Sequence, residues 1–455
     1  MQLPALRSPF YGDDYLLLLA SRDMSWLDFL RATWDPGADP GLLRLSETYW
    51  RPLSFLTFRL VYPLFGDHPM PYHLLMLGIH CAAIVLVWTL AWRLIKNQAG
   101  ASVATVVFAL HPAGFESVAW ISAINSAALP LALGGWLAFE RAVRSDSPEA
   151  RRRALILSLV LMALALAYRE TVIVIPAAML LWYLIVEVQT GWRRREVFVL
   201  AGSQLMLLAL FLGFSGIFSD SGGRSVIQLD GEVPKVWWYY GKQALYPSVP
   251  EHGSTAFRLQ QLLGLGLLLV PVVALVRRQW LIVAFGAGFF ASLVPYAMFN
   301  LGFGPRYFYF PSILFALMAG AVIAATAPEI ERRVSRSTAV PASLAAAGAA
   351  CLLFMVLGYN RTGEWVETKP DVHQRWVDQV KEQYPQLPDN GGLFVVDTPF
   401  ALAFFDAYVL RPTVAYIYPN GEHPVFVIDQ EHIEYAKSVM KPGDRMFIFE
   451  EFPPE

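Results

Sequence analysis

The stretch YHLLMLGIHCAAIVLVWTLAWRL, residues 72–94, decides the fold of this chain. Crossing the hydrocarbon core of a bilayer takes about 20 predominantly apolar residues, and this run is long enough. The composition agrees, because 56% of the 455 residues are hydrophobic and only 16% are charged. Soluble domains carry about 25% charged residues. The sequence therefore predicts an all-α, polytopic membrane protein.

Further apolar runs follow, with basic residues clustered between them. The expected membrane segments after the first are 99–113, 121–142, 153–168, 170–188, 197–218, 258–276, 280–299, 308–327 and 339–358. Arginine and lysine clusters fall on every second connection, as at Arg93, Lys96 and Arg277–Arg278. Such clusters mark cytoplasmic connections. The alternate loops, the N-terminus and the tail are therefore expected on the extracytoplasmic face of a cell membrane (plasma or inner). An N-terminus on that face predicts another transmembrane helix upstream of Met1.

The chain is expected to have three parts. Residues 1–71 form an extracytoplasmic loop with an acidic pair and helices along the membrane surface, because charge, tryptophan and short apolar pieces alternate there. Residues 72–358 form the transmembrane helical bundle. Residues 359–455 form a small extracytoplasmic α/β domain. Its strand-like runs LFVVD, VFVID and RMFIFE alternate with the helix-like runs DVHQRWVDQVKEQY and QEHIEYAKSV.

Net charge argues against nucleic-acid binding, and cysteine content argues against a disulfide framework or a cysteine metal site. The net charge of −2 argues against a nucleic-acid partner. The two cysteines, Cys81 and Cys351, each lie inside an apolar run and form neither a disulfide framework nor a metal motif.

The hexapeptide FYGDDY, residues 10–15, places two adjacent carboxylates between aromatic residues near the membrane surface. A carboxylate shielded from water has a raised pKa and can serve as a general base. We expect Asp13 or Asp14 to be that base, and by a narrow margin Asp14. The pair could instead coordinate a divalent cation such as Mg²⁺ or Mn²⁺, or be solvated loop residues.

Three more candidates follow on the same expected face. Arg51 comes after a tryptophan, and could bind a phosphate through its planar fork or anchor the chain among lipid headgroups. His111 ends an apolar run before a proline, and Glu116 follows five residues later. These two could bind a substrate or cap a helix end. One histidine and one glutamate are too few to predict a zinc site.

Later loops add basic and aromatic candidates for binding the donor and substrate. Arg169 and Glu170 sit where two spans meet, and ionisable groups at membrane depth are functional candidates. Lys242 follows four successive aromatics, which form either an interfacial belt or a surface for a sugar or a lipid tail. Arg306 and Tyr307 lie in a second basic and aromatic stretch, GPRYFYFP.

Four stretches together resemble one family. They are SETYWRPLSFLTFRLVYPLFGDHPMPYHLLMLGIH (46–80), FALHPAGFESVAWIS (108–122), AYRETVIVIP (167–176) and GPRYFYFPS (304–312). In order and spacing they are similar to the membrane part of the transmembrane and tetratricopeptide-containing O-mannosyltransferases and their bacterial relatives (glycosyltransferase family 39-like). The resemblance covers roughly residues 10–315. It implies the GT-C superfamily fold, with about 10–11 transmembrane helices of ~20 residues each and an outward-facing cavity.

The resemblance also implies a reaction. The donor would be a sugar on polyprenyl phosphate, delivered from the membrane lipid, and the acceptor a hydroxyl of a protein, lipid or glycan. The pair Asp13 and Asp14 would hold the catalytic base of an inverting transfer, and an arginine would stabilise the leaving phosphate. The residues matching the family's phosphate-binding positions are Arg51, His111, Glu116 and Arg306.

The chain departs from the family pattern at three places. Relatives often carry asparagine where this chain has Met76, a basic residue followed by aspartate within 123–126, and Lys-Glu where this chain has Arg169-Glu170. No tetratricopeptide repeats follow. Two other functions stay open: a transporter or flippase for a lipid-linked glycan, and a catalytically inactive membrane scaffold. A transporter would show paired charges at mid-membrane and repeat symmetry, and the sequence has neither.

Overall fold

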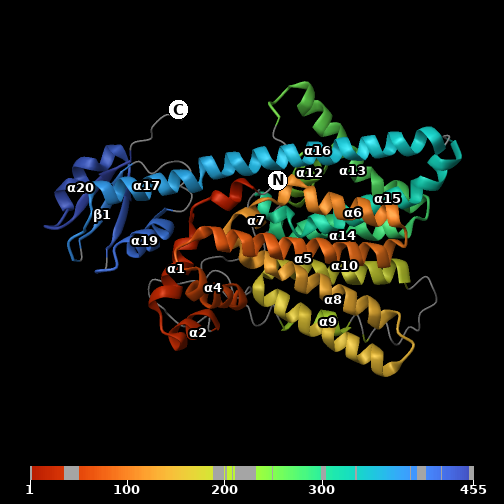
Figure 1. Cartoon of the computed structure of the whole chain (residues 1–455), viewed down its shortest axis with the longest axis horizontal. Helices are drawn as coiled ribbons and strands as arrows, with labels where there is room; N and C mark the ends of the chain where they lie inside the picture. Colours follow the sequence, from red (N-terminus) through yellow and green to blue (C-terminus); the bar gives the residue numbers. More distant parts are fainter. Residues whose placement is uncertain are drawn as a thin grey trace.

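The chain forms a long helical bundle with a small α/β appendage at one end (Figure 1). The computed structural model describes residues 3–34, 51–187, 199, 202–207, 209–210, 232–247, 250–298, 304–333, 336–389, 391–396, 406–421 and 423–449. The expected membrane segment at 197–218 lies largely outside these residues. The other expected segments all coincide with helices.

The bundle is built from helices that pack pairwise along its length. They are α5 (Pro69–Ile95), α6 (Gln98–Leu110), α8 (Ala128–Val143), α9 (Pro148–Tyr168), α10 (Val174–Trp182), α12 (Glu232–Leu245), α13 (Thr255–Val276), α14 (Trp280–Met298), α15 (Pro311–Arg333) and α16 (Arg336–Thr368). Short turns connect them: η2 (Pro112–Gly114), α7 (Glu116–Ala119), η3 (Ile121–Ala127), η4 (Glu170–Ile173), η5 (Tyr183–Glu187) and η8 (Pro305–Phe308). The neighbours include α5 with α6, α6 with α15, α8 with α9, and α10 with α14.

Local sequence explains where several of these helices begin and end. Asn97, Ser147 and Ser254 cap α6, α9 and α13, since each side chain accepts a hydrogen bond from a backbone N–H of the first turn. His111 ends α6 in an extended conformation, because the proline that follows disfavours helical backbone at the residue before it.

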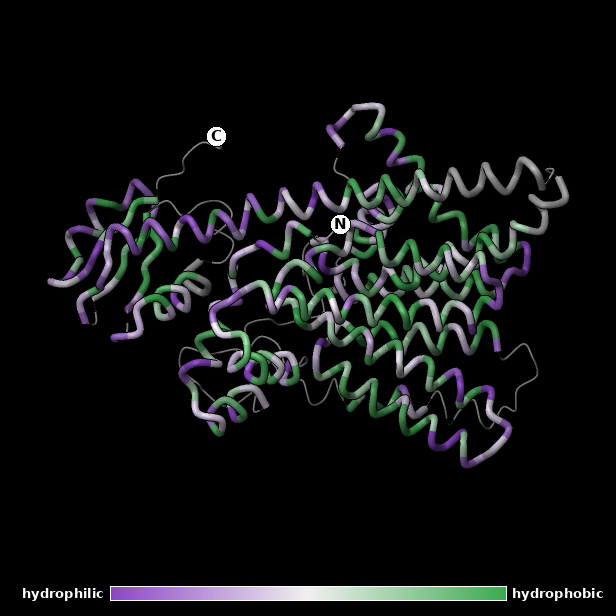
Figure 2. The backbone as a smooth tube through the Cα atoms, viewed as in Figure 1, coloured by the Kyte–Doolittle hydropathy of each residue, from purple (hydrophilic) through white to green (hydrophobic). Residues whose placement is uncertain are grey.

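The bundle is a multi-pass membrane structure by length and composition. Within the described residues, four helical segments are long and apolar enough to cross a bilayer: Pro69–Ile95, Ile121–Val143, Thr255–Val276 and Trp280–Ala297. Shorter apolar helices accompany them at Pro52–Phe65, Gln98–Leu110, Thr171–Glu187 and Pro311–Ala327. Figure 2 shows hydrophobic residues dominating the bundle, and polar ones spread over the appendage. On α13, large apolar side chains such as Leu262 and Val276 point outward, as expected for a lipid-facing surface.

Two glycines let α6 and α15 approach closely. A Cβ atom on Gly100 would lie 2.5 Å from the Gly320 carbonyl oxygen, and one on Gly320 would lie 2.3 Å from the Gly100 carbonyl oxygen. No other residue fits at this crossing without moving the backbone. Small residues at helix crossings are the usual means of close packing in membranes.

An ion-pair network lies at the end of the bundle far from the appendage. Glu140, on α8, pairs with Arg93 of α5 and with Arg144, both at 2.8 Å. Arg144 also reaches Glu187 at 3.3 Å. The Glu140 side chain is only 4% exposed, so these cations supply the charge compensation that its burial requires.

The N-terminal region forms short helices beside the other end of the bundle. They are η1 (Pro4–Arg7), α1 (Asp13–Asp23), α2 (Trp26–Trp34) and α4 (Pro52–Phe65). Arg59 of α4 ties three of them together, because it donates to the carbonyl oxygens of Ser21 and Met24 and stacks on Trp26. The expected acidic loop is thus partly helical, with the acidic pair in the first turn of α1.

The appendage has a three-stranded parallel sheet in the order β2-β1-β3. Its elements are α17 (Pro370–Gln383), β1 (Leu393–Val396), α19 (Asp406–Ile417), β2 (Val425–Ile428), η9 (Gln430–His432), α20 (Ile433–Val439) and β3 (Arg445–Ile448). The strand-like runs expected from the sequence become the three strands, so the predicted α/β character is confirmed. The expected boundary at 358 falls inside α16, which runs from the bundle into the appendage (Figure 1).

Candidate functional site

The acidic pair sits on a tight turn at the start of α1. Gly12 is the N-cap residue, with φ of +61°, a left-handed conformation that glycine adopts without steric cost. The turn is fixed from one side by Trp120, whose ring N–H donates to the Tyr11 carbonyl oxygen (3.2 Å). Because α1 begins at Asp13, both carboxylates lie where the helix dipole favours negative charge.

Asp14 is buried and held by the backbone. Its Oδ2 accepts from the Tyr11 N–H (2.9 Å) and its Oδ1 from the Ser122 N–H (2.6 Å). Burial raises the pKa of Asp14 to about 8, and the two N–H donors oppose that rise. With both oxygens engaged, Asp14 joins α1 to the η3 turn of the bundle.

Asp13 is half-buried, and the charges of two arginines act on it. Burial raises the pKa of Asp13 above its ordinary value, while the guanidinium groups of Arg306 and Arg51 oppose that rise. Of the two carboxylates, Asp13 is the one whose ionised form the arginines favour. The sequence alone does not show which of the two side chains the backbone holds, and the choice of the base stays a prediction.

Arg306 is held over an aromatic surface. It lies in η8 and stacks on Trp120, with 5.1 Å from its Cζ to the ring centroid. Its Nη2 donates to the Tyr307 hydroxyl (3.1 Å). Stacking and this hydrogen bond orient the guanidinium near Asp13, to whose ionised form its charge is favourable.

Glu116 positions the backbone of Arg306. Its side chain is 4% exposed, and Oε2 accepts from the Arg306 backbone N–H (3.2 Å). Ser117 donates to the Arg306 carbonyl oxygen (3.2 Å). The other Glu116 oxygen lies 3.7 Å from Lys369 Nζ, at the start of the appendage. Glu116 thus connects the η8 turn with the C-terminal region.

The structure places other sequence candidates in the bundle. His111 is buried, donates from Nε2 to the Ala244 carbonyl oxygen (2.8 Å) and stacks on Phe308. Arg169 ends α9 with its guanidinium 5.8 Å from the Phe310 ring centroid. Lys242 lies over Trp238 at 5.6 Å. Glu170 begins η4, and its side chain is outside the described part.

Two residues near the acidic turn were missed by sequence reasoning. Lys369 contacts Glu116, and His373 of α17 accepts a hydrogen bond from the Gly12 N–H (3.2 Å). Both come from a region outside the family resemblance, and no local pattern marks them. Two of the positions that depart from the family pattern are in contact, since Ser126 Oγ lies 4.0 Å from Met76 Sδ.

The described residues contain no group of three or more histidine, cysteine, aspartate or glutamate side chains arranged to hold a metal ion. The Mg²⁺ or Mn²⁺ considered from the sequence would rest on the acidic pair. Both oxygens of Asp14 accept backbone N–H groups, so the pair is a poor fit for a divalent cation.

Comparison with known proteins finds a family match over part of the chain. Residues 51–214 match the family described as dolichyl-phosphate-mannose-protein mannosyltransferase. The resemblance predicted from the sequence is confirmed. The acidic turn lies before the matched residues and Arg306 after them.

Similar curated proteins include three protein O-mannosyl-transferases. A protein O-mannosyl-transferase of Drosophila melanogaster, Tmtc1, is 32% identical over 38% of this chain and 20% of its own length. A second one, Tmtc2, is 33% identical over 38% and 19%, and human TMTC1 is 31% identical over 26% and 14%. The chain therefore matches about a fifth or less of the length of these relatives.

Solved structures of similar outline exist as well. ArnT from Cupriavidus metallidurans in the apo state has a TM-score of 0.47 at 14% identity, over 96% of this chain and 86% of that one. The same protein bound to undecaprenyl phosphate has a TM-score of 0.42 at 13% identity, over 96% and 85%. A likeness at this level is too loose to equate individual residues.

Proposed function

We propose that this protein is an inverting glycosyltransferase that moves a sugar from a polyprenyl-phosphate donor to a hydroxyl acceptor. The observation that carries the proposal is a half-buried carboxylate at Asp13 whose ionised form is favoured by the charge of Arg306, a guanidinium that Trp120 and Tyr307 orient. The family match and the mannosyltransferase relatives support a lipid-linked sugar as donor.

Asp13 is the proposed general base. It takes the proton of the acceptor hydroxyl as the hydroxyl oxygen forms a bond to the anomeric carbon of the sugar. A carboxylate whose pKa is raised by burial is a stronger base than one in water. Asp14 holds the turn through its two backbone hydrogen bonds and touches no substrate in this scheme.

Arg306 is the proposed phosphate clamp. As the bond from the anomeric carbon to the phosphate oxygen breaks, its electron pair stays on that oxygen, and the leaving polyprenyl phosphate gains negative charge. A guanidinium already oriented by Trp120 and Tyr307 stabilises this charge without reorganising. Arg51, whose charge also favours the ionised form of Asp13, is the proposed second cation. The single displacement inverts the anomeric centre.

The proposed location follows from charge distribution. The bundle end that carries Asp13 and Arg306 is the extracytoplasmic one, because the arginine clusters near Arg93 and Arg144 lie at the opposite end. The acceptor is a hydroxyl of a protein, lipid or glycan that reaches this face.

The test uses the full chain in nanodiscs. Polyprenyl-phosphate mannose is supplied as the first probe, with polyprenyl-phosphate glucose as the control donor and a hydroxyl-bearing peptide as acceptor. Release of polyprenyl phosphate with formation of glycopeptide of inverted configuration supports the proposal. Donor movement between the two leaflets without cleavage would instead establish a flippase. Donor binding without cleavage or movement would establish an inactive scaffold.

A further inference from the structure

Helix α17 of the appendage contacts the acidic turn directly. His373, which is fully buried, accepts the Gly12 N–H at Nδ1 (3.2 Å). Its ring packs against Tyr11 and Tyr15, with centroids 5.9 and 5.1 Å away. The contact joins residues 361 positions apart, so the appendage and the N-terminal turn form one packed unit.

His373 is suited to be a permanent acceptor. Because Nδ1 accepts from Gly12, the ring hydrogen is on Nε2, which lies 3.3 Å from Thr413 Oγ1 on α19. Burial lowers the pKa of His373 to about 3, so the ring stays neutral at physiological pH. The Gly12 N–H, which can only donate, therefore fixes the tautomer, and the Thr413 hydroxyl oxygen can accept the Nε2 hydrogen.

A second contact reaches the arginine side of the site. Lys369, the N-cap residue of α17, lies 3.7 Å from Glu116 Oε1, while Glu116 Oε2 accepts from the Arg306 N–H. Lys369 compensates a buried carboxylate that holds the Arg306 backbone in place. The first turn of α17 thus touches both halves of the candidate site.

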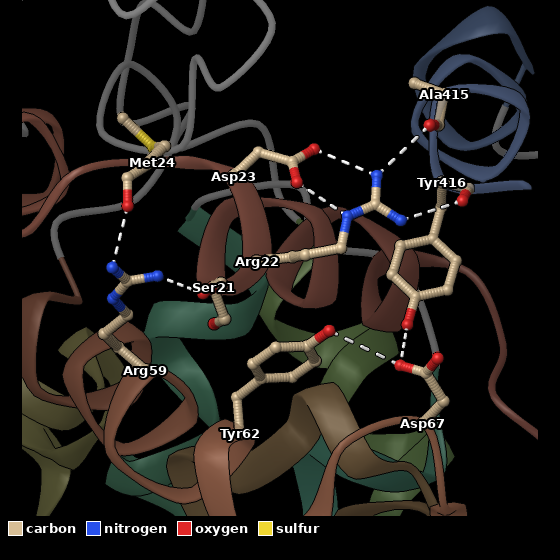
Figure 3. Close-up of polar contacts among 9 residues, drawn as sticks. All are labelled: Ser21, Arg22, Asp23, Met24, Arg59, Tyr62, Asp67, Ala415 and Tyr416. Atoms are coloured by element: carbon tan, nitrogen blue, oxygen red, sulfur yellow. Dashed lines mark hydrogen bonds and ion pairs between the residues drawn. The ribbon is translucent and has the colours of Figure 1, made fainter. Parts of the chain in front are cut away.

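Further contacts join α19 of the appendage to the N-terminal region. Figure 3 shows Arg22 of α1 donating to the carbonyl oxygens of Tyr416 and Ala415 on α19, and Tyr416 donating to Asp67. The Arg22 guanidinium also stacks on the Tyr416 ring at 4.6 Å. These contacts lie one helical turn or more from Asp13, and they hold the appendage rather than the acidic turn.

We propose that the appendage is a positioning element of the active site, with His373 orienting the Gly12–Asp13 turn and Lys369 orienting Arg306 through Glu116. His373 and Lys369 are positioning residues, since neither acts on substrate. The catalytic consequence rests on the proposed transferase function. The structural consequence, an ordered Gly12–Asp13 turn, does not depend on that function.

The first experiment compares two variants of equal shape. Asn at position 373 keeps an acceptor atom where Nδ1 lies, whereas Leu has none, and both leave a similar cavity. His373→Leu should raise hydrogen exchange in the segment 10–15 by about tenfold, and His373→Asn should restore most of the protection. Tyr416→Phe is the matched control, since it loses a hydrogen bond in the same interface and should leave this segment protected.

The second experiment measures turnover by the same proteins. His373→Leu should lower kcat by about tenfold to a hundredfold at nearly constant donor KM, because the base is misplaced and the phosphate site is kept. Lys369→Met, which keeps the side-chain length and removes the charge, should mainly raise the donor KM.

The outcomes separate the two proposals. Equal exchange in His373→Leu and His373→Asn, or equal exchange in His373→Leu and Tyr416→Phe, overturns the role of His373. An unchanged donor KM in Lys369→Met overturns the role of Lys369. If wild-type protein transfers no sugar, the transferase proposal fails, while the exchange data still decide whether His373 orders the turn.

Discussion

Buried carboxylates near the two ends of α5 are compensated by different partners. Near its C-terminus, Glu140 is matched by two guanidinium groups at 2.8 Å. Near its N-terminus, where Tyr72 packs on Phe10, the carboxylates of Asp14 and Glu116 accept from backbone N–H groups, and the cation beside Glu116, Lys369, is 3.7 Å away. Tyr72 and Arg93, near the two ends, are about 30 Å apart along the helix at 1.5 Å per residue. The ion-pair network at the C-terminal end neutralises its own charges and stabilises the fold. At the N-terminal end the carboxylates are held mainly by backbone N–H groups, which leaves the Arg306 guanidinium available to a ligand.

Replacing Asp13 should have the largest effect on activity of the changes at the two ends of α5. Asp13→Asn cannot accept the acceptor's proton, so kcat should fall by about a hundredfold to ten-thousandfold, while binding of polyprenyl phosphate survives. Single-turnover rates in nanodiscs measure it. The control is Glu140→Gln at the other end, which removes one carboxylate and should keep the wild-type rate per folded molecule. Equal rates for Asp13→Asn and wild type would exclude Asp13 as the base.

Replacing Glu140 should instead affect stability. Glu140→Gln leaves Arg93 and Arg144 without their shared carboxylate. Since these arginines are 45% and 32% exposed, water recovers part of the loss. The free energy of unfolding should fall by about 2 kcal/mol, between the values for exposed and buried pairs. Thermal unfolding in detergent measures it, and an unchanged midpoint would contradict a structural role for the network.

Asp14 provides a smaller test within the site. Asp14→Asn keeps the size of the side chain, but its amide nitrogen cannot accept one of the two backbone N–H groups. The expected loss of stability is about 1–2 kcal/mol, with little change in single-turnover rate once folded protein is selected. A rate loss as large as that of Asp13→Asn, at full stability, would return Asp14 to the role of base.

The smallest effect concerns pH. Arg306 lowers the pKa of Asp13 against the rise caused by burial. Removing its charge makes the carboxylate harder to ionise, so the acid limb of kcat/KM should move to higher pH in Arg306→Gln. Arg93→Gln, at the far end of the bundle, should leave the limb in place. If the acid limb of kcat/KM moved equally in both variants, it would report protein stability and not the ionisation of Asp13.

Hydropathy predicted the helical bundle, and the strand-like runs LFVVD, VFVID and RMFIFE predicted the three strands. Hydropathy also predicted a membrane segment at 339–358, whereas α16 extends over Arg336–Thr368. The extension GYNRTGEWVET is too polar to register as a membrane segment, because hydropathy reports contact with lipid and not helix length.

The candidate site was only partly predictable. Asp13 and Arg306 could be proposed from motif and topology. Choosing Asp13 over Asp14 required the backbone donors at Tyr11 and Ser122, and one of these is 108 residues away. His373 could not be found at all, because its partner Gly12 is distant in sequence and its own helix shows only an ordinary amphipathic pattern.

The continuous helix α16 has a practical consequence for imaging. It passes from the bundle into the appendage with one residue, Lys369, between it and α17, and α19 is tied to α1 by Arg22. No flexible linker separates the two bodies. In electron micrographs of a 50.9 kDa membrane protein, a helical bundle inside a detergent belt offers few features for alignment. The appendage, over which polar residues are spread (Figure 2), is expected to stand outside that belt and to give particles an asymmetric feature for alignment.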